Sequence, residues 1–175
     1  NGPSLRVLWA VLNSPVANAY AYCSSGKRET LVKEWRAFPL PRMTPEGAQA
    51  IETAASVYLA AVEASEAAFM QPHTTHDVER ALLALDAEVL KLYDLPPRLE
   101  RELLDRFTGV ERKGVGCDFR GYYPPGFTSY LPLHELISDR FQHAAADATA
   151  DRFKPGESEY VRDVLRAAVA GKGEE

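Results

Sequence analysis

The residues best suited to chemistry are scattered along this chain. His73 and His76 stand beside Asp77, but no third ligand follows at a spacing that would complete a metal site. Gly114 and Gly116 suggest a phosphate loop, yet the apolar strand that must precede such a loop is missing. No serine lies in a Gly-x-Ser-x-Gly turn. We therefore expect no catalytic residues, no metal and no cofactor, and we predict that this chain is not an enzyme by itself.

The charge is unevenly divided along the sequence. Residues 1–44 contain six Lys or Arg and two acidic residues, a net charge of +4, whereas residues 45–110 contain five basic and twelve acidic residues, a net charge of -7. The remainder, with nine basic and eleven acidic residues, carries -2. Any contact with a polyanion such as DNA is therefore expected in residues 1–44.

Length and composition favour a single compact unit inside the cell. The chain has 175 residues, of which 46% are hydrophobic, enough to bury one core. No stretch reaches the roughly 18 apolar residues of a membrane span, and the N-terminus lacks the basic region of a signal peptide. Cys23 and Cys117 have neither disulfide nor metal spacing. We expect a cytoplasmic location and, because the sequence starts at Asn1, a segment of a longer chain.

Helices are predicted for the N-terminal part. Apolar residues at spacings of three and four predict a helix over 5–12 with one apolar face, formed by Leu5, Leu8, Trp9 and Leu12. Asn13, Ser14 and Pro15 then give a cap followed by proline, which begins a second helix over 15–23. The β-forming residues in 28–38 predict a short strand with Trp35 and Phe38 in the core.

A helical hairpin is the clearest prediction. Thr44 and Pro45 begin a helix that runs to about residue 69, and the next helix has an apolar seam spaced four, three, four and three, formed by Val78, Leu82, Leu85, Val89 and Leu92. A further helix is expected over 96–107. Residues 111–131 are a long Gly- and Pro-rich loop with five aromatic residues, expected to pack across the helices. Last helices are predicted over 133–141 and 160–169.

Together these patterns predict a mainly α fold: an antiparallel helical hairpin or bundle with a short β segment near the N-terminus and a long aromatic loop. We divide the chain into 1–44, the end of a recognition-type domain; 45–110, the helical hairpin; and 111–175, the aromatic loop and C-terminal helices. All three are expected to pack as one unit.

Three stretches, in this order, resemble the C-terminal part of adenine-specific DNA methyltransferases of restriction-modification systems: residues 8–20 (LWAVLNSPVANAY), 85–95 (LDAEVLKLYDL) and 119–127 (FRGYYPPGF). The first is followed by Lys27 and Arg28 and by FPLP at 38–41, and the third by LPLHE at 131–135. The resemblance covers roughly residues 5–137 and implies a region that follows or ends the target-recognition domain.

The catalytic part of that family has no counterpart in this sequence. Its S-adenosylmethionine-binding glycine motif is missing, and the sequence DLPP at 94–97 is a helix boundary that does not match the Asn/Asp-Pro-Pro-aromatic motif that holds a flipped adenine. The resemblance therefore implies a non-catalytic DNA-recognition or scaffolding region, with DNA and an upstream methyltransferase domain or partner subunit as its partners.

The candidate DNA contacts lie in the basic N-terminal segment. They are the cations and polar groups around its predicted turn and strand, Lys27, Arg28, Lys33, Arg36, Asn13 and Ser14. Two alternatives remain open. In the first, the basic residues form only the solvent face of a strand. In the second, the chain is a helical protein-protein interaction module without nucleic-acid binding. A homodimer built on the N-terminal helices is also left open.

Overall fold

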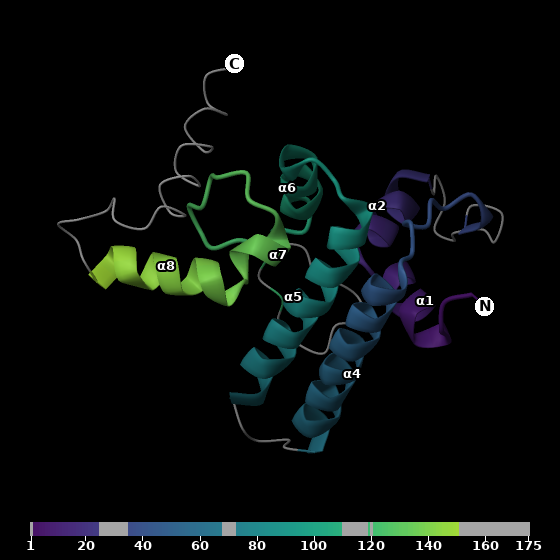
Figure 1. Cartoon of the computed structure of the whole chain (residues 1–175), viewed down its shortest axis with the longest axis horizontal. Coiled ribbons are helices and arrows are strands. Elements are labelled where there is room, and N and C mark those ends of the chain that lie inside the picture. Colours follow the sequence, from purple (N-terminus) through teal and green to yellow (C-terminus); the bar gives the residue numbers. More distant parts are fainter. Residues whose placement is uncertain (1, 25–34, 68–72, 110–118, 120, 151–175) are drawn as a thin grey trace.

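The computed structural model describes residues 2–24, 35–67, 73–109, 119 and 121–150 (Figure 1). This described part is helical and contains no strand. No helix in it is long and apolar enough to cross a membrane. The helices are α1 (Leu5–Leu12), α2 (Pro15–Ser24), α4 (Pro45–Ala67), α5 (His73–Tyr93), α6 (Pro97–Asp105), α7 (Leu133–Leu136) and α8 (Asp139–Ala150).

The predicted hairpin is confirmed by α4 and α5, two long antiparallel helices that lie side by side (Figure 1). The Thr44 hydroxyl accepts a hydrogen bond from the Gly47 amide at 3.0 Å and so caps α4. A Cβ atom at position 47 would overlap the Leu92 side chain, so glycine lets the start of α4 approach the end of α5. The core between the two helices is formed by Ile51, Ala55, Tyr58, Val78, Leu82, Leu85, Val89 and Leu90.

The apolar face predicted for α1 is not the face that is buried. Val7, Ala10 and Val11 point into the core, whereas Leu5, Trp9 and Leu12 are 86%, 37% and 41% exposed. A second stripe with spacings of three and four runs through these smaller side chains, and only one stripe can face α4 and α5. Small and β-branched residues allow α1 to approach the hairpin closely, so the bulkier stripe remains outside.

The predicted strand over 28–38 is not found where the chain is described. Residues 28–34 lie outside the described residues, while Trp35 and Arg36 are helical and the Phe38 amide donates to the Trp35 carbonyl at 3.2 Å. The spacing of three between Trp35 and Phe38 places both rings on one side of this turn, with centroids 5.7 Å apart. Propensity favoured a strand, but this apolar spacing is helical.

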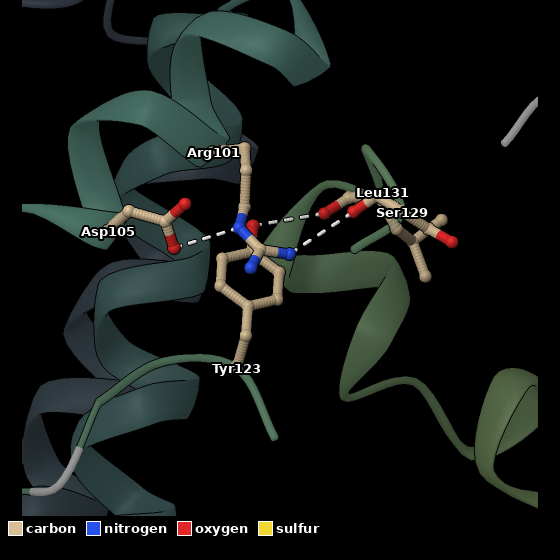
Figure 2. Close-up of polar contacts among 5 residues, drawn as sticks. All are labelled: Arg101, Asp105, Tyr123, Ser129 and Leu131. Carbon is tan, nitrogen blue, oxygen red and sulfur yellow. Dashed lines mark hydrogen bonds and ion pairs between the residues drawn. The ribbon is translucent and has the colours of Figure 1, made fainter. Parts of the chain in front are cut away.

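The described part of the aromatic loop, residues 119 and 121–131, packs on the helices as predicted, and Arg101 of α6 anchors it. The Arg101 guanidinium lies 4.1 Å from the centre of the Tyr123 ring, donates to the Ser129 carbonyl at 3.3 Å and pairs with Asp105 at 2.8 Å (Figure 2). The Tyr123 hydroxyl donates to the Leu131 carbonyl at 3.0 Å, which closes the loop on itself. One cation therefore fixes two separate points of the loop.

The single helix predicted over 133–141 is instead two helices, α7 and α8. Ser138 separates them, because its hydroxyl accepts a hydrogen bond from the Phe141 amide at 3.2 Å and caps α8. The helix predicted over 160–169 lies outside the described residues. Buried residues of the main core cluster come from each of the three sequence segments, for example Val7, Leu85 and Leu133.

Candidate nucleic-acid interface

The corner between α1 and α2 uses its polar residues for structure. The Ser14 side chain is fully buried, and its hydroxyl accepts from the Ala17 amide at 3.4 Å, as a helix cap does. The Asn13 side chain donates to the Trp9 carbonyl at 2.8 Å, and Asn18 donates to the Asn13 and Ser14 carbonyls at 3.0 and 2.9 Å. Ser14 thus has no surface to offer DNA, and Asn13 is exposed but already bonded.

Among the predicted basic contacts, Arg36 is described and exposed, whereas Lys27, Arg28 and Lys33 lie outside the described residues. The rings beside Arg36 hold its backbone in place, because Phe38 is 6% exposed and packs edge-on against Tyr20 of α2 at 5.2 Å. Arg42 is also exposed a few residues further on. The structure therefore presents two cations from a segment attached to the core, but it does not place all the predicted contacts together.

A hydrogen bond from α5 fixes the segment that carries these cations. The Tyr93 hydroxyl donates to the Pro39 carbonyl at 3.0 Å, and burial raises the pKa of Tyr93 to about 12. The phenol therefore remains a hydrogen-bond donor at every pH at which the protein would be handled. This contact joins the basic segment to the acidic hairpin at one defined point.

Acidic side chains are absent from α1 and α2, whose one charged residue is Arg6. Residues 1–28 contain no Asp or Glu, and the exposed Arg6 donates to the Ser56 hydroxyl at 2.9 Å at the edge of α4. The largest net negative charge, -7, lies in residues 45–110. A polyanion would thus be attracted to the N-terminal part and repelled by the hairpin, which would give it one preferred side of approach.

An exposed apolar stripe on α1 is the other surface feature of this region. We call Leu5, Trp9 and Leu12 the α1 stripe. The Trp9 ring stacks on Tyr58 of α4 with centroids 6.3 Å apart, so its position is fixed although it is partly exposed. Sequence analysis found these residues but did not indicate that they would face outward.

Two buried acidic residues were missed by sequence analysis. Asp86, 2% exposed, accepts a hydrogen bond from the Tyr122 hydroxyl at 2.8 Å, and Glu100, also 2% exposed, accepts from the Leu133 amide at 2.6 Å. Burial raises the pKa of the Glu100 carboxyl, and the Leu133 hydrogen bond and nearby His134 partly oppose this. Asp86 therefore joins the aromatic loop to α5, and Glu100 joins α7 to α6. The sequence signal that could have identified them is that each lies on the apolar face of its helix, α5 for Asp86 and α6 for Glu100.

The described residues contain no group of three or more His, Cys, Asp or Glu side chains that could hold a metal ion. His76, which stands beside Asp77 in the sequence, is exposed. Cys23 is an exposed free thiol at the end of α2, with Arg106 donating toward its sulfur at 3.9 Å. The described surfaces around α1, α2 and the Arg36–Arg42 segment present cations, hydrogen-bonding groups and apolar side chains.

Comparison with known proteins does not identify a family for this chain. A scan against protein-family models, a search of curated proteins and a search of solved structures each found nothing that matches. The likeness to methyltransferase C-terminal regions therefore stays a prediction from the sequence motifs.

Proposed function

We propose that this chain is a non-catalytic DNA-recognition and scaffolding region of the kind that an adenine-specific restriction-modification methyltransferase carries in its C-terminal part. The observation that carries the proposal is the attachment of a segment with two exposed arginines to the helical core. Arg36 and Arg42 are exposed, while Phe38 and the Tyr93 hydrogen bond hold the chain between them against the core.

Phosphate contacts are the role that suits these cations. Lys and Arg side chains neutralise phosphates and fix the position of a protein on a duplex without reading its sequence. Lys27, Arg28 and Lys33 immediately precede the described turn and add to the same charge. The helical hairpin, with its acidic composition, serves as the scaffold and keeps DNA to the basic side.

The test is fluorescence anisotropy of the chain with a labelled duplex of mixed sequence at several salt concentrations. Four phosphate contacts would lower the affinity about a hundredfold between about 50 and 200 mM salt. We expect Arg36→Glu/Arg42→Glu and Arg28→Glu/Lys33→Glu to weaken binding and to reduce this salt dependence. Arg80→Glu/Arg98→Glu is the matched control, since both arginines are exposed on the acidic part. Equal losses in all variants, or no binding at low salt, would contradict the proposal.

The α1 stripe favours a second candidate function, a helical interaction module that pairs with a second copy of itself. Leu5 and Leu12 lie on either side of Trp9. An antiparallel second copy of α1 would therefore place Leu5 of each copy beside Leu12 of the other. Residues 1–28 contain no Asp or Glu that would repel the same residue of a second copy. The Arg6 side chain donates a hydrogen bond to Ser56 of its own chain.

Sedimentation equilibrium tests this second candidate. We expect a monomer-dimer equilibrium that Leu5→Glu/Leu12→Glu abolishes and that Leu40→Glu, a change at another exposed leucine, leaves intact. A monomer at the highest measurable concentration would rule out pairing through the α1 stripe. DNA binding by the Leu5→Glu/Leu12→Glu protein would separate the two functions.

A further inference from the structure

An open groove runs along the α4–α5 hairpin where α7 meets it. Its volume is about 870 Å³, and its lining comes from α4, α5 and the chain from α7 into α8. Small side chains make its apolar floor, which is formed by Ala50, Ala54, Ala84 and Ala87. Alanine side chains on both helices leave space that the side chains of another helix can fill.

The rim of this groove is acidic. Glu46 at the start of α4, Glu88 on α5 and Asp139 at the start of α8 all line it. No Lys or Arg is among the described residues that line the groove, and His134 is their other titratable member. An apolar floor with acidic edges fits a helix that has one apolar face flanked by basic residues.

We propose that this groove is the docking site of the chain's own C-terminal segment, residues 160–169. These residues lie outside the described part of the chain, and their sequence predicts a helix. Its apolar positions are spaced three and four apart over two turns, formed by Val161, Val164, Leu165, Ala168 and Val169. Arg162 and Arg166, four residues apart, lie along one edge of this stripe, where they would meet the acidic rim.

The length of the connecting chain allows this docking. Asp139, the first residue of α8, lines the groove, and α8 leads away from the hairpin for 12 residues (Figure 1), which is about 18 Å. The nine residues 151–159 that follow span up to about 30 Å when extended. Residue 160 can therefore return to the groove from the far end of α8.

Tethering makes this segment the preferred occupant of the groove. A linker of this length holds the segment at an effective concentration in the millimolar range, which a free helix of similar composition would rarely reach. The segment from 160 to 172 has three basic residues and one acidic residue, so its charge complements the three carboxylates of the rim. This inference is independent of the proposed DNA contact, because none of the residues that line the groove belongs to the basic segment 1–44.

Amide hydrogen exchange of the full chain, read by mass spectrometry, tests the proposal. A helix of about ten residues is marginal in water, so protection in 160–169 would report docking. We expect Glu46→Lys/Glu88→Lys to lower that protection about tenfold, and a protein that combines it with Arg162→Glu/Arg166→Glu to recover it. Glu63→Lys, an exposed change on α4 outside the groove, should leave the protection unchanged.

Two further results would overturn the proposal. Absence of protection in 160–169 of the unmodified protein would show that the segment does not dock. Protection that rises with protein concentration would assign the groove to the segment of a second copy instead. Circular dichroism of each variant checks that α4 and α5 remain folded, and the recovery of protection by the charge swap does not depend on that check.

Discussion

Replacing Arg101 with alanine should destabilise the protein far more than the same change at Arg98, three residues earlier on α6. The change removes the guanidinium from the Tyr123 ring, 4.1 Å away, its hydrogen bond to the Ser129 carbonyl at 3.3 Å and its ion pair with Asp105 at 2.8 Å. A cation–π contact contributes about 1 kcal/mol, a charged hydrogen bond about 1.5 and a helical ion pair about 0.5. We expect a loss of about 3 kcal/mol.

Arg98 is a matched control because it shares residue type, helix and ion-pair geometry. It pairs with Glu102 at 3.2 Å across one turn, but its side chain is 62% exposed, compared with 14% for Arg101. Arg98→Ala should therefore lower the free energy of unfolding by no more than about 0.5 kcal/mol. Since both changes introduce alanine into α6, any gain in helix propensity cancels in the comparison.

Urea denaturation followed by circular dichroism measures both losses, provided that the slope with urea is unchanged between variants. Hydrogen exchange in residues 121–131 should rise in Arg101→Ala alone, because the aromatic loop would lose its attachment to α6. A loss for Arg101→Ala within about 0.5 kcal/mol of that for Arg98→Ala would refute the reasoning. The loop would then be held by its apolar packing, and the cation–π contact would contribute little.

Three more changes probe buried polar contacts, each by urea denaturation. Glu100→Gln retains an oxygen for the Leu133 amide but removes a charge whose burial raises the pKa from 4.5. The folded state binds the Glu100 proton more tightly than the unfolded state, so the free energy of unfolding of the unmodified protein should fall as pH rises from 4.5 through the raised pKa. Over the same interval the stability of Glu100→Gln should rise relative to that of the unmodified protein. Ser14→Ala should cost about 1 kcal/mol as a lost cap and leave DNA anisotropy unchanged. Tyr122→Phe should cost about 2 kcal/mol, because it removes a hydrogen bond from buried Asp86.

Local signals were sufficient to predict most helices of the fold. Thr44 and Pro45 begin α4 as a cap followed by proline, and the seam from Val78 to Val89 is buried as a regular apolar spacing requires. Such signals depend on residues within one or two turns of each other, so they can be read without knowing the fold. The break between α7 and α8 depends on a local signal as well, the Ser138 cap, which was overlooked within an apolar pattern.

Tertiary choices could not be predicted in the same way. Helix α1 has two apolar stripes, and the choice between them depends on how closely Val7, Ala10 and Val11 allow α4 to approach. The turn at Trp35 and Phe38 was predicted as a strand because propensity carries no information about the ring of Tyr20, which packs against Phe38. For α1 the deciding contact comes from another element, and at Phe38 the contact with Tyr20 of α2 adds to the local helical spacing.

The candidate site shows the same division between local and tertiary information. The exposed charge of Arg36 follows from sequence, since cations rarely enter a core. Ser14 was expected to reach outward, yet the cap signal that begins α2 requires its hydroxyl to turn toward the Ala17 amide. A residue that satisfies a strong local structural signal is therefore a weak candidate for ligand contact. By that reasoning the search for DNA contacts should concentrate on cations without a capping or core role, beginning with Arg36 and Arg42.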